Sequence, residues 1–213
     1  MLDKILSALY PQRCVTCGEF LWPKPVSICR DCLGRINFID TPFFNPDIDD
    51  CYFRTARSVA SYESVWRDVI HDFKFNNRPE LAALLARHLA KLVNFEYDAV
   101  LPVPMSGKRL RERGYNHSAL LAKELSGLLG FPCRFFGLER IKDTKAQVGL
   151  SRRLRFQNVK GSFAVPKREF VEGADILLVD DVMTTGATVN ECAKELKKAG
   201  ASGVDVVTLA RAL

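Results

Sequence analysis

Two adjacent carboxylates followed by a run of small, hydroxyl-bearing residues form the pattern in this chain with the most specific chemistry. Asp180 and Asp181 come shortly before the segment Thr184-Thr185-Gly186-Ala187-Thr188. A carboxylate pair repels phosphate, but it can accept hydrogen bonds from the two vicinal hydroxyls of a ribose. A glycine lets the backbone approach a ligand closely, and threonine hydroxyls add donors for a phosphate group. The pattern therefore predicts a site for a ribose 5-phosphate.

The residues around this pattern predict a strand before it and a helix after it. The apolar run from Ile176 to Val179 is typical of a buried parallel strand, and helical spacing runs from Val189 to Leu196, before Gly200. A further apolar run, Val204 to Ala210, completes a strand–helix–strand unit. Open α/β sheets bind ligands at the carboxyl ends of their strands, and a helix N-terminus attracts phosphate. The alternative is an ordinary strand–helix turn in which the acids only cap the helix.

A second strand–loop–helix unit carries a cluster of cations. The run from Ala99 to Val103 predicts a strand, and Ala119 to Leu129 predicts a helix that Gly130 ends. The loop between them contains Lys108, Arg109, Arg111 and Arg113. In a parallel sheet this loop can adjoin the acid-pair loop, so that a pyrophosphate would bridge the cations and the ribose phosphate. Upstream, the patterns predict a strand over Arg57 to Tyr62 and two amphipathic helices over Val65 to Phe73 and Leu81 to Val93.

Four cysteines near the N-terminus predict a metal site. They form two Cys-x-x-Cys pairs, Cys14 with Cys17 and Cys29 with Cys32. Four thiolates at this spacing can close a tetrahedral zinc site, and the alternative is a set of redox-active cysteines. The segment is too short to fold on apolar contacts alone, so we expect the zinc to be structural. The other three cysteines, Cys51, Cys133 and Cys192, are not expected to contribute.

The role of this zinc module stays open between binding nucleic acid, binding protein and capping the main domain. Aromatic rings and arginines can stack on bases and contact phosphates, although aromatic residues more often pack. The candidates are Phe20, Trp22, Arg13, Arg30 and Arg35. Residues 40–50, with two prolines and four aspartates, are typical of a linker. We therefore expect a zinc-finger module over residues 1–45 and a main domain over residues 46–213.

Composition places the chain among globular proteins with an uneven charge. It has 213 residues, of which 47% are hydrophobic and 26% charged, and its net charge is +6. Residues 105–160 hold 13 Lys/Arg against 4 Asp/Glu, so this segment carries +9 and the remainder −3. A basic segment favours pyrophosphate or a nucleic-acid backbone, while the alternative is a solvated surface. Without a signal peptide or a membrane-spanning apolar run, we expect a cytoplasmic protein.

The polar, basic segment 142–160 permits two interpretations. Its periodicity is weak, and it contains Arg152 and Arg153. It can form a mobile flap that closes over a reactive pyrophosphate and excludes water, or an ordinary exposed helix. The sequence does not decide between them.

The acid-pair segment resembles the phosphoribosyl pyrophosphate loop of the type I phosphoribosyltransferases. That family places an apolar strand, an acid pair and a short Thr/Gly-rich loop in this order. Together with the cysteine pairs, the run Arg109-Leu-Arg-Glu-Arg-Gly-Tyr-Asn116 and the series Thr144, Gln147, Leu150, Arg155, Asn158 and Phe163, the whole chain resembles the ComF (ComFC/GntX-like) competence family. The resemblance implies an α/β, type I phosphoribosyltransferase-like parallel sheet flanked by helices, with a small N-terminal four-cysteine zinc module.

The resemblance also implies roles for individual residues and partners. Asp180, Asp181 and Thr184 to Thr188 would hold the ribose phosphate, and Arg109 and Arg113 would face the pyrophosphate, with Mg²⁺ bound to it. The family is associated with DNA uptake in natural transformation, alongside a helicase-like partner, ComFA. One departure is His117, where the family usually has Gln, and we expect this side chain at the surface or behind the site.

Two interpretations from different classes remain. The first is a competence protein that binds phosphoribosyl pyrophosphate while its basic face and zinc module engage single-stranded DNA or a partner. The second is an active phosphoribosyltransferase that transfers 5-phosphoribosyl to an unidentified small-molecule acceptor. The pattern shows no obvious base-recognition pocket or catalytic base, so the catalytic residues stay unassigned.

Overall fold

A parallel four-stranded sheet forms the centre of the protein. The computed structural model describes residues 13–21, 28–39, 50–144 and 151–212. The strands are β1 (Thr55–Ser61), β2 (Ala99–Pro102), β5 (Asp175–Met183) and β6 (Gly203–Arg211), and they lie in the order β1-β6-β5-β2. Because every pair in this sheet is parallel, all four carboxyl ends meet at one edge. This confirms the predicted parallel sheet, with β5 between two neighbours.

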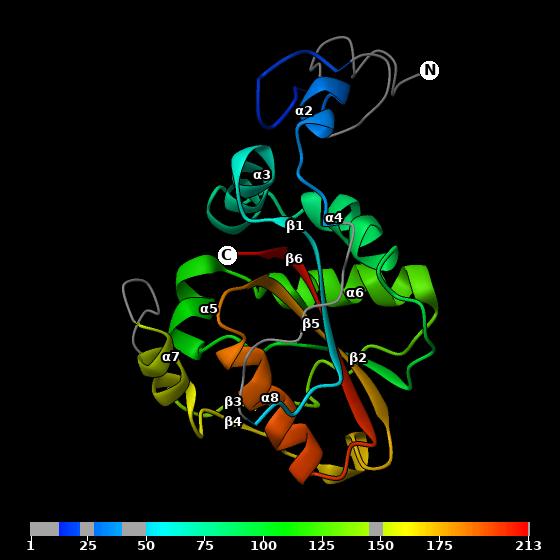
Figure 1. Ribbon diagram of the computed structural model, residues 1–213, viewed down its shortest axis with the longest axis vertical. Helices are drawn as coiled ribbons and strands as arrows, with labels where there is room; N and C mark the ends of the chain where they lie inside the picture. The colour runs from blue at the N-terminus through cyan, green and yellow to red at the C-terminus, as the bar shows by residue number, and fades with distance from the viewer. Residues whose placement is uncertain (1–12, 22–27, 40–49, 145–150, 213) are drawn as a thin grey trace.

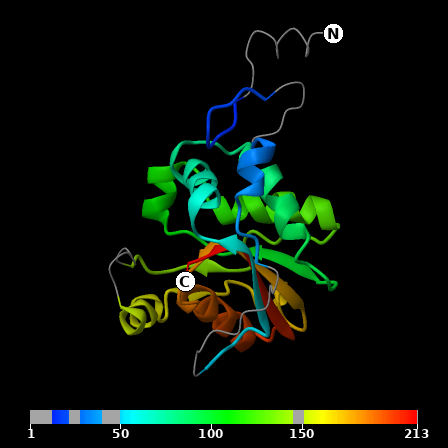
Figure 2. The same cartoon turned by 45° about the horizontal axis from the view of Figure 1, so that its top comes forward.

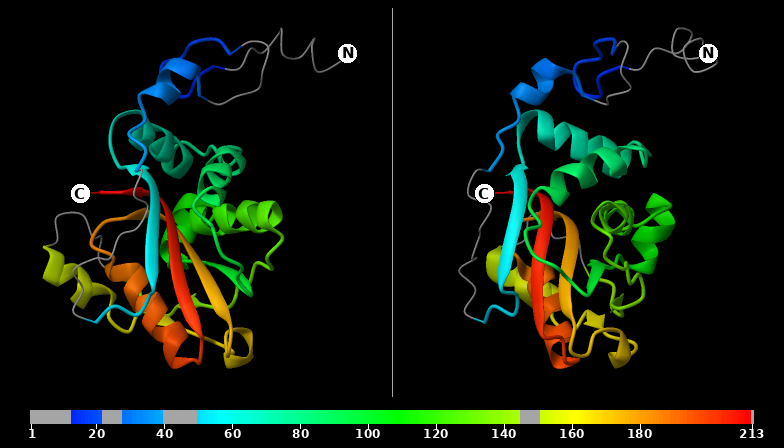
Figure 3. Two further views of the ribbon diagram at one scale, coloured as in Figure 1. Left: turned by 45° about the vertical axis from the view of Figure 1, so that its right-hand side comes forward. Right: turned by 90° about the vertical axis from the view of Figure 1, so that its right-hand side faces the viewer.

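Helices cover both faces of the sheet, as predicted. They are α2 (Arg30–Gly34), α3 (Ser64–Phe75), α4 (Leu81–Ala90), α5 (Gly107–Arg113), α6 (His117–Leu129), α7 (Arg152–Val159), the 3-10 helix η1 (Arg168–Phe170) and α8 (Ala187–Lys198). Figure 3 shows α8 on one side of the sheet and α4 and α6 on the other. A two-stranded antiparallel ribbon, β3 (Glu139–Arg140) with β4 (Phe163–Ala164), lies near α8. Within the described residues, none of the helices is long and apolar enough to cross a membrane.

The strand that carries the acid pair is longer than its apolar run predicts. β5 continues through both aspartates to Met183, because its backbone stays paired with β6, for example Asp180 with Thr208 and Val182 with Ala210. Hydrogen bonding in the ladder depends on the backbone and not on side-chain polarity, so two acids do not end the strand. The carboxylates therefore stand on a rigid element and not in the following loop.

The zinc module is attached to the main domain through the edge of the sheet. Residues 37–39 run antiparallel to β1, with Phe38 bridged to Ala60 and the Ile39 amide donating to the Val59 carbonyl at 3.0 Å. The module then sits beyond α3 and α4, at the top of the molecule (Figure 1, Figure 2). Its Ile36 belongs to the same buried cluster as Trp66 of α3. The boundary expected between residues 45 and 46 lies outside the described residues.

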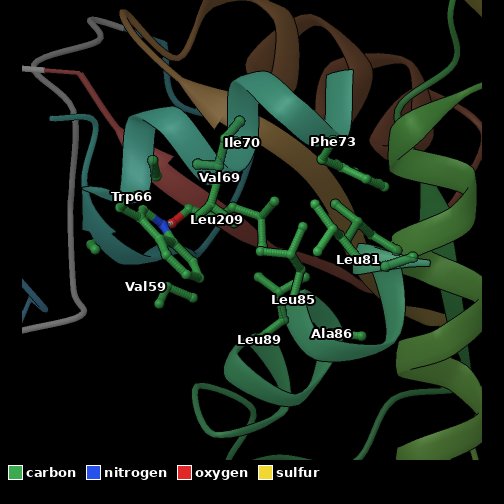
Figure 4. Packing of buried hydrophobic residues seen from close by; sticks show 14 of the residues in the cluster. Val59, Trp66, Val69, Ile70, Phe73, Leu81, Leu85, Ala86, Leu89 and Leu209 are labelled. Carbon is green, nitrogen blue, oxygen red and sulfur yellow. Dashed lines mark hydrogen bonds between the residues drawn. The ribbon is translucent and has the colours of Figure 1, made fainter. Parts of the chain in front are cut away.

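Helix α3 is anchored on the sheet by a buried indole. The Trp66 side chain has no exposed surface, and its Nε1–H donates a hydrogen bond of 2.6 Å to the Leu209 carbonyl of β6. Val69, Ile70 and Phe73 bury the rest of the same stripe against α4 and the sheet (Figure 4). A helical stripe of this kind fixes the rotation of α3 about its axis, and so fixes where its polar residues point.

We expect Trp66→Phe to lower the free energy of unfolding by about 1–3 kcal/mol, because the Leu209 carbonyl loses its buried partner and the smaller ring leaves a void. Urea denaturation followed by circular dichroism measures the change. Arg67→Ala, on the exposed side of α3, is the control and should stay within about 0.5 kcal/mol of wild type. Equal stability of Trp66→Phe and wild type would contradict the anchoring role.

Candidate functional site

The loop after β5 forms a small hollow at the start of α8. Gly186 adopts φ 76°, in the left-handed region that favours glycine, and acts as the helix N-cap without a side chain. The Ala187 amide donates to the Thr185 hydroxyl at 3.4 Å. The hollow has a volume of about 30 Å³ and is lined by Asp180, by residues 182–184 and by residues 186–189. It lies at the positive end of the α8 dipole, which favours an anion.

Asp180 is fixed by a hydrogen bond from α6 and lines the hollow. Its Oδ1 accepts hydrogen bonds of 2.9 Å from the Ser118 hydroxyl and from the Asp181 amide. Burial, and next the negative charge of Asp181, raises the pKa of Asp180 to about 7. Its Oδ2 has no hydrogen-bond partner among the residues that the structure describes, so a ligand hydroxyl can donate to it.

Asp181 is paired with a cation from the neighbouring helix. The Lys74 ammonium of α3 lies 2.8 Å from Asp181 Oδ2, and both side chains are only 14% exposed. Asp181 Oδ1 accepts from the Val182 amide at 2.6 Å. Burial opposes ionisation of Asp181, but the Lys74 charge outweighs it and holds the pKa of this carboxyl below its usual range. The acid pair thus consists of two carboxyls with different proton affinities.

His117 lies behind the acid pair and not at the surface. Its side chain is completely buried, and neither ring nitrogen has a hydrogen-bond partner in the described structure. The ring contacts Phe73 edge-on and Tyr115 at a tilt, with centroids 5.2 and 4.9 Å apart. Burial lowers the pKa of His117 to about 4, so the imidazole is neutral at pH 7. Of the two positions expected for His117, the surface position is wrong and the position behind the site is correct.

The cations predicted on the loop after β2 lie on α5. Ser106 caps α5 by accepting from the Arg109 amide, and Gly114 ends the helix at φ 80°. Arg109 interacts electrostatically with Arg140 of β3, and Arg113 stands over the Phe75 ring at 4.7 Å, within electrostatic reach of His117. The two arginines therefore differ: Arg109 lies within electrostatic reach of Arg140, whereas Arg113 lies over the Phe75 ring at the end of α3.

Three residues of the site were not identified from the sequence: Lys74, Ser118 and Arg140. Burial, and next the repulsion from Arg109, lowers the pKa of Arg140, which also feels the charge of Asp180. A bound anion would offset the repulsion between these two guanidinium groups. Lys74 could have been found from the sequence, because it lies one turn after Ile70 and so places a charged side chain in line with the apolar stripe of α3. Ser118 lies two residues after the run from Arg109 to Asn116 that carries the family resemblance. No sequence pattern marks Arg140 as a site residue.

The four predicted metal ligands come together in the zinc module. Their sulfur atoms all lie within 4.8 Å of one another, and the Sγ atoms of Cys17 and Cys29 are 3.7 Å apart. A tetrahedral zinc with bonds of about 2.3 Å separates its sulfurs by about 3.8 Å, so the cluster fits this ion. Burial opposes ionisation of Cys14, but amide hydrogen bonds, first that of Cys17, outweigh it and lower its pKa to about 6. Cys51, Cys133 and Cys192 lie outside the cluster, as predicted.

The aromatic candidates of the zinc module are only partly described. Phe20 is 54% exposed, and the Arg13 guanidinium covers its ring at 3.8 Å from the centroid. An exposed ring with a stacked cation suits a base or a peptide chain equally. Trp22 lies outside the described residues, as does the part of segment 142–160 between 145 and 150. The remainder of that segment contains helix α7, which begins at the Ser151 N-cap.

Comparison with known proteins gives two family matches and several named relatives. The Phosphoribosyl transferase domain matches residues 76–213, and the Double zinc ribbon domain matches residues 5–43. The chain is 37% identical over 164 residues to DNA utilization protein YhgH of Salmonella typhi, covering 73% of this chain and 71% of that protein. It is 40% identical over 154 residues to Competence protein F of Haemophilus influenzae, covering 68% and 67%. Competence protein ComFC of Bacillus subtilis is 28% identical over 205 residues, covering 93% and 77%.

We expect Asp180→Asn to stabilise the protein above pH 7 by about 1–3 kcal/mol. The pKa of Asp180 is about 7 in the folded protein, above its unfolded value near 4. The contribution of Asp180 to the free energy of unfolding is therefore fully present below pH 4 and is lost as the pH rises through about 7. The neutral amide does not carry this cost. Thermal melts from pH 4 to pH 8 should show a Tm difference that grows with pH. A difference that is constant over this range would contradict the raised pKa, and exposed Asp68→Asn is the control.

We expect purified protein to contain about one zinc ion per chain, as a single closed four-ligand site requires. Elemental analysis measures the ratio. Cys29→Ser/Cys32→Ser should lose the metal, because a pair of thiolates cannot close the tetrahedral site, while Cys51→Ser/Cys133→Ser should retain it. A metal-free wild type with a folded N-terminal module would refute the assignment.

Proposed function

The chain belongs to the ComFC-like family of competence and DNA-utilization proteins, and on this premise we propose that it binds phosphoribosyl pyrophosphate with Mg²⁺ and serves the uptake or use of DNA. The observation that carries the proposal is the acid pair on β5, held by Ser118 and Lys74 beside the Gly186 hollow. The carboxylate oxygens can accept hydrogen bonds from ligand hydroxyls, and they lie next to a site that favours an anion. A ribose phosphate needs both.

Each part of the ligand has a matching group in this arrangement. The ribose hydroxyls would donate to Asp180 Oδ2 and to the neighbouring Asp181, while the 5-phosphate would lie on the amides and hydroxyls of Thr184 to Thr188. The hollow itself has room for about one water molecule by volume, so the rest of the ligand would extend over the edge of the sheet. There Arg109 and Arg140 would offset the charge of the pyrophosphate, and Mg²⁺ would bind its oxygens. Arg113 would contribute from the side of α3.

The Lys74–Asp181 ion pair has a specific role in this proposal. A buried carboxylate pair that carried two charges would repel an incoming phosphate more strongly than a pair with one compensated charge. Lys74 reduces this repulsion by compensating the charge of Asp181, and its own side chain is only 14% exposed. The pair therefore presents oxygen acceptors to the ribose at a reduced electrostatic cost for the phosphate.

The alternative function is transfer of the 5-phosphoribosyl group to an unidentified acceptor. The bond between C1 of the ribose and the pyrophosphate oxygen would break, a bond from C1 to the acceptor would form, and pyrophosphate would leave toward Arg109. A phosphoribosyltransferase fold does not by itself imply this activity. His117 does not supply the base for such a step, because it is completely buried behind the acid pair. Release of pyrophosphate against a panel of nucleobases and single-stranded DNA distinguishes transfer from binding.

The DNA-related part of the proposal rests on the names of the relatives and on the +9 charge of residues 105–160. Single-stranded DNA would contact this basic segment and the Arg13–Phe20 surface of the zinc module, with an affinity that falls steeply with salt. The helicase-like partner ComFA stays a prediction of the family resemblance. Co-purification of the two proteins tests it directly.

We expect wild type to bind phosphoribosyl pyrophosphate in the presence of Mg²⁺ and Asp180→Asn/Asp181→Asn to bind it at least about 100-fold more weakly. Hydrogen bonds to charged groups contribute about 1.5–3 kcal/mol each, and this variant weakens two or more of them. Isothermal titration calorimetry measures both affinities. Asp68→Asn/Asp72→Asn changes two acids on the exposed side of α3 and should bind like wild type. Equal affinity of the acid-pair variant and wild type would sink the assignment.

A further inference from the structure

A second cavity lies between α7 and α8, apart from the acid pair. Its volume is about 570 Å³, within the range of sites that bind small organic ligands. Its walls are the two helices and the chain before β1, and its distinctive lining residues are Tyr52, Phe156, Arg152, Arg153, Lys160 and Lys194. In Figure 1, α7 lies beside the N-terminal half of α8, which agrees with the contacts between the two helices.

The walls of this cavity are tied together by buried or shared polar groups. Asn190 of α8 is 7% exposed, accepts from the Tyr52 amide at 2.8 Å and donates to the Asp50 carbonyl at 2.8 Å. Glu191, one residue later, accepts from the Gly161 amide at 2.7 Å, just beyond the end of α7. One turn of α8 therefore holds both opposing walls, and the cavity is a built feature of the fold.

The charge of the lining is strongly positive. Four cations line the cavity against two carboxylates, and one of these, Glu191, is already bound to a backbone amide. Arg152 and Arg153 stand in the first turn of α7, which contains no acid. Cations at the N-terminal end of a helix are repelled by its dipole, and an anion bound beside them would offset this repulsion. The lining thus selects for a negatively charged ligand.

Aromatic rings distinguish this cavity from a simple anion site. Tyr52 and Phe156 are both half-buried, and the Lys194 ammonium stands 5.6 Å from the centre of the Tyr52 ring. Planar rings beside cations are the chemistry that holds a nucleic-acid base together with its phosphate. An inorganic phosphate would use the cations but would leave the rings and most of the volume without a partner.

We propose that the cavity between α7 and α8 is a nucleotide-binding site. The base would stack on Phe156 or Tyr52, and the phosphate would contact Arg153 and Lys194, with further charge from Arg152 and Lys160. The nucleotide would be a free mononucleotide or one unit of a single-stranded DNA chain, since both present the same base and phosphate. The site is distinct from the acid pair, although α8 contributes to both: its first residues line the hollow and the next turn lines the cavity.

The test measures binding of fluorescently labelled (dT)12 to wild type and variants by anisotropy at low salt. We expect Phe156→Ala to weaken binding by about 10-fold, because stacking of one base contributes an effect of that size. Arg153→Gln/Lys194→Gln, two partly or fully exposed positions, should also weaken binding and reduce the salt slope by about 1.4. Lys91→Gln/Lys167→Gln removes the same charge at two exposed positions outside the basic segment and should behave like wild type. Circular dichroism melts check that each variant is folded.

Competition distinguishes the two sources of the nucleotide. Displacement of (dT)12 by dTMP or AMP would show a mononucleotide site, whereas no displacement combined with weaker binding by both cavity variants would show a site for a DNA chain. Displacement by inorganic phosphate as effective as that by dTMP, with no effect of Phe156→Ala, would overturn the nucleotide proposal. Unchanged (dT)12 binding by both cavity variants would overturn it as well.

The same variants separate this proposal from the proposed function. Asp180→Asn/Asp181→Asn should keep wild-type binding of (dT)12, and Arg153→Gln/Lys194→Gln should keep wild-type binding of phosphoribosyl pyrophosphate in calorimetry. Loss of (dT)12 binding only in the acid-pair variant would refute the cavity and place the nucleotide at the acid pair instead.

Discussion

The burial of two neighbouring carboxylates in one strand is the constraint on which the arrangement of this protein depends. Asp180 and Asp181 are adjacent in β5, and each loses hydration while it repels the other. Compensation comes from outside the strand: Ser118 of α6 donates to one acid, and Lys74 of α3 pairs with the other. Both helices must therefore be held in fixed positions over the carboxyl edge of the sheet.

The apolar core provides this fixed placement. The indole of Trp66 bonds to the backbone of β6, and β6 is also the strand that keeps β5 paired through the acid pair. The same strand thus holds the carboxylates in line and anchors the helix that carries Lys74. Phe73 lies directly before Lys74 and packs edge-on against His117, which fills the space behind the acids. An apolar layer around a neutral imidazole keeps water from screening the Lys74–Asp181 pair.

Helix α8 borders two regions of positive electrostatic potential. At its N-terminus the helix dipole and the Gly186 loop favour a phosphate, and one turn later Asn190 and Glu191 hold the walls of a cationic, aromatic cavity. If both regions bind anions as proposed, α8 offers a physical route by which one ligand can affect the other, since both depend on the position of the same backbone. The zinc module does not share this helix; it joins the sheet at β1 and the apolar layer at Ile36.

Local sequence patterns were sufficient for the parts of the protein whose chemistry depends on spacing. The two cysteine pairs predicted the metal cluster, because two ligands with two residues between them on a tight turn can reach the same ion whatever the rest of the fold does. The strand–helix–strand unit around Gly186 followed from apolar runs and from the glycine. The observed strand extends past the predicted one, because backbone pairing with β6 continues through side chains that a hydropathy pattern treats as a break.

Tertiary structure alone decided which groups meet the acid pair. Lys74 and Arg140 lie 106 and 40 residues before Asp180 in the chain, and only the packing of α3 and β3 brings them close. The burial of His117 was equally hidden, because a histidine next to polar residues gives no sign of an apolar pocket formed by Phe73 and Tyr115. The sequence by itself determined the types of chemistry present and their local geometry, while long-range packing determined the proton affinities and charge partners, since both depend on burial and distance in space and not on position in the chain.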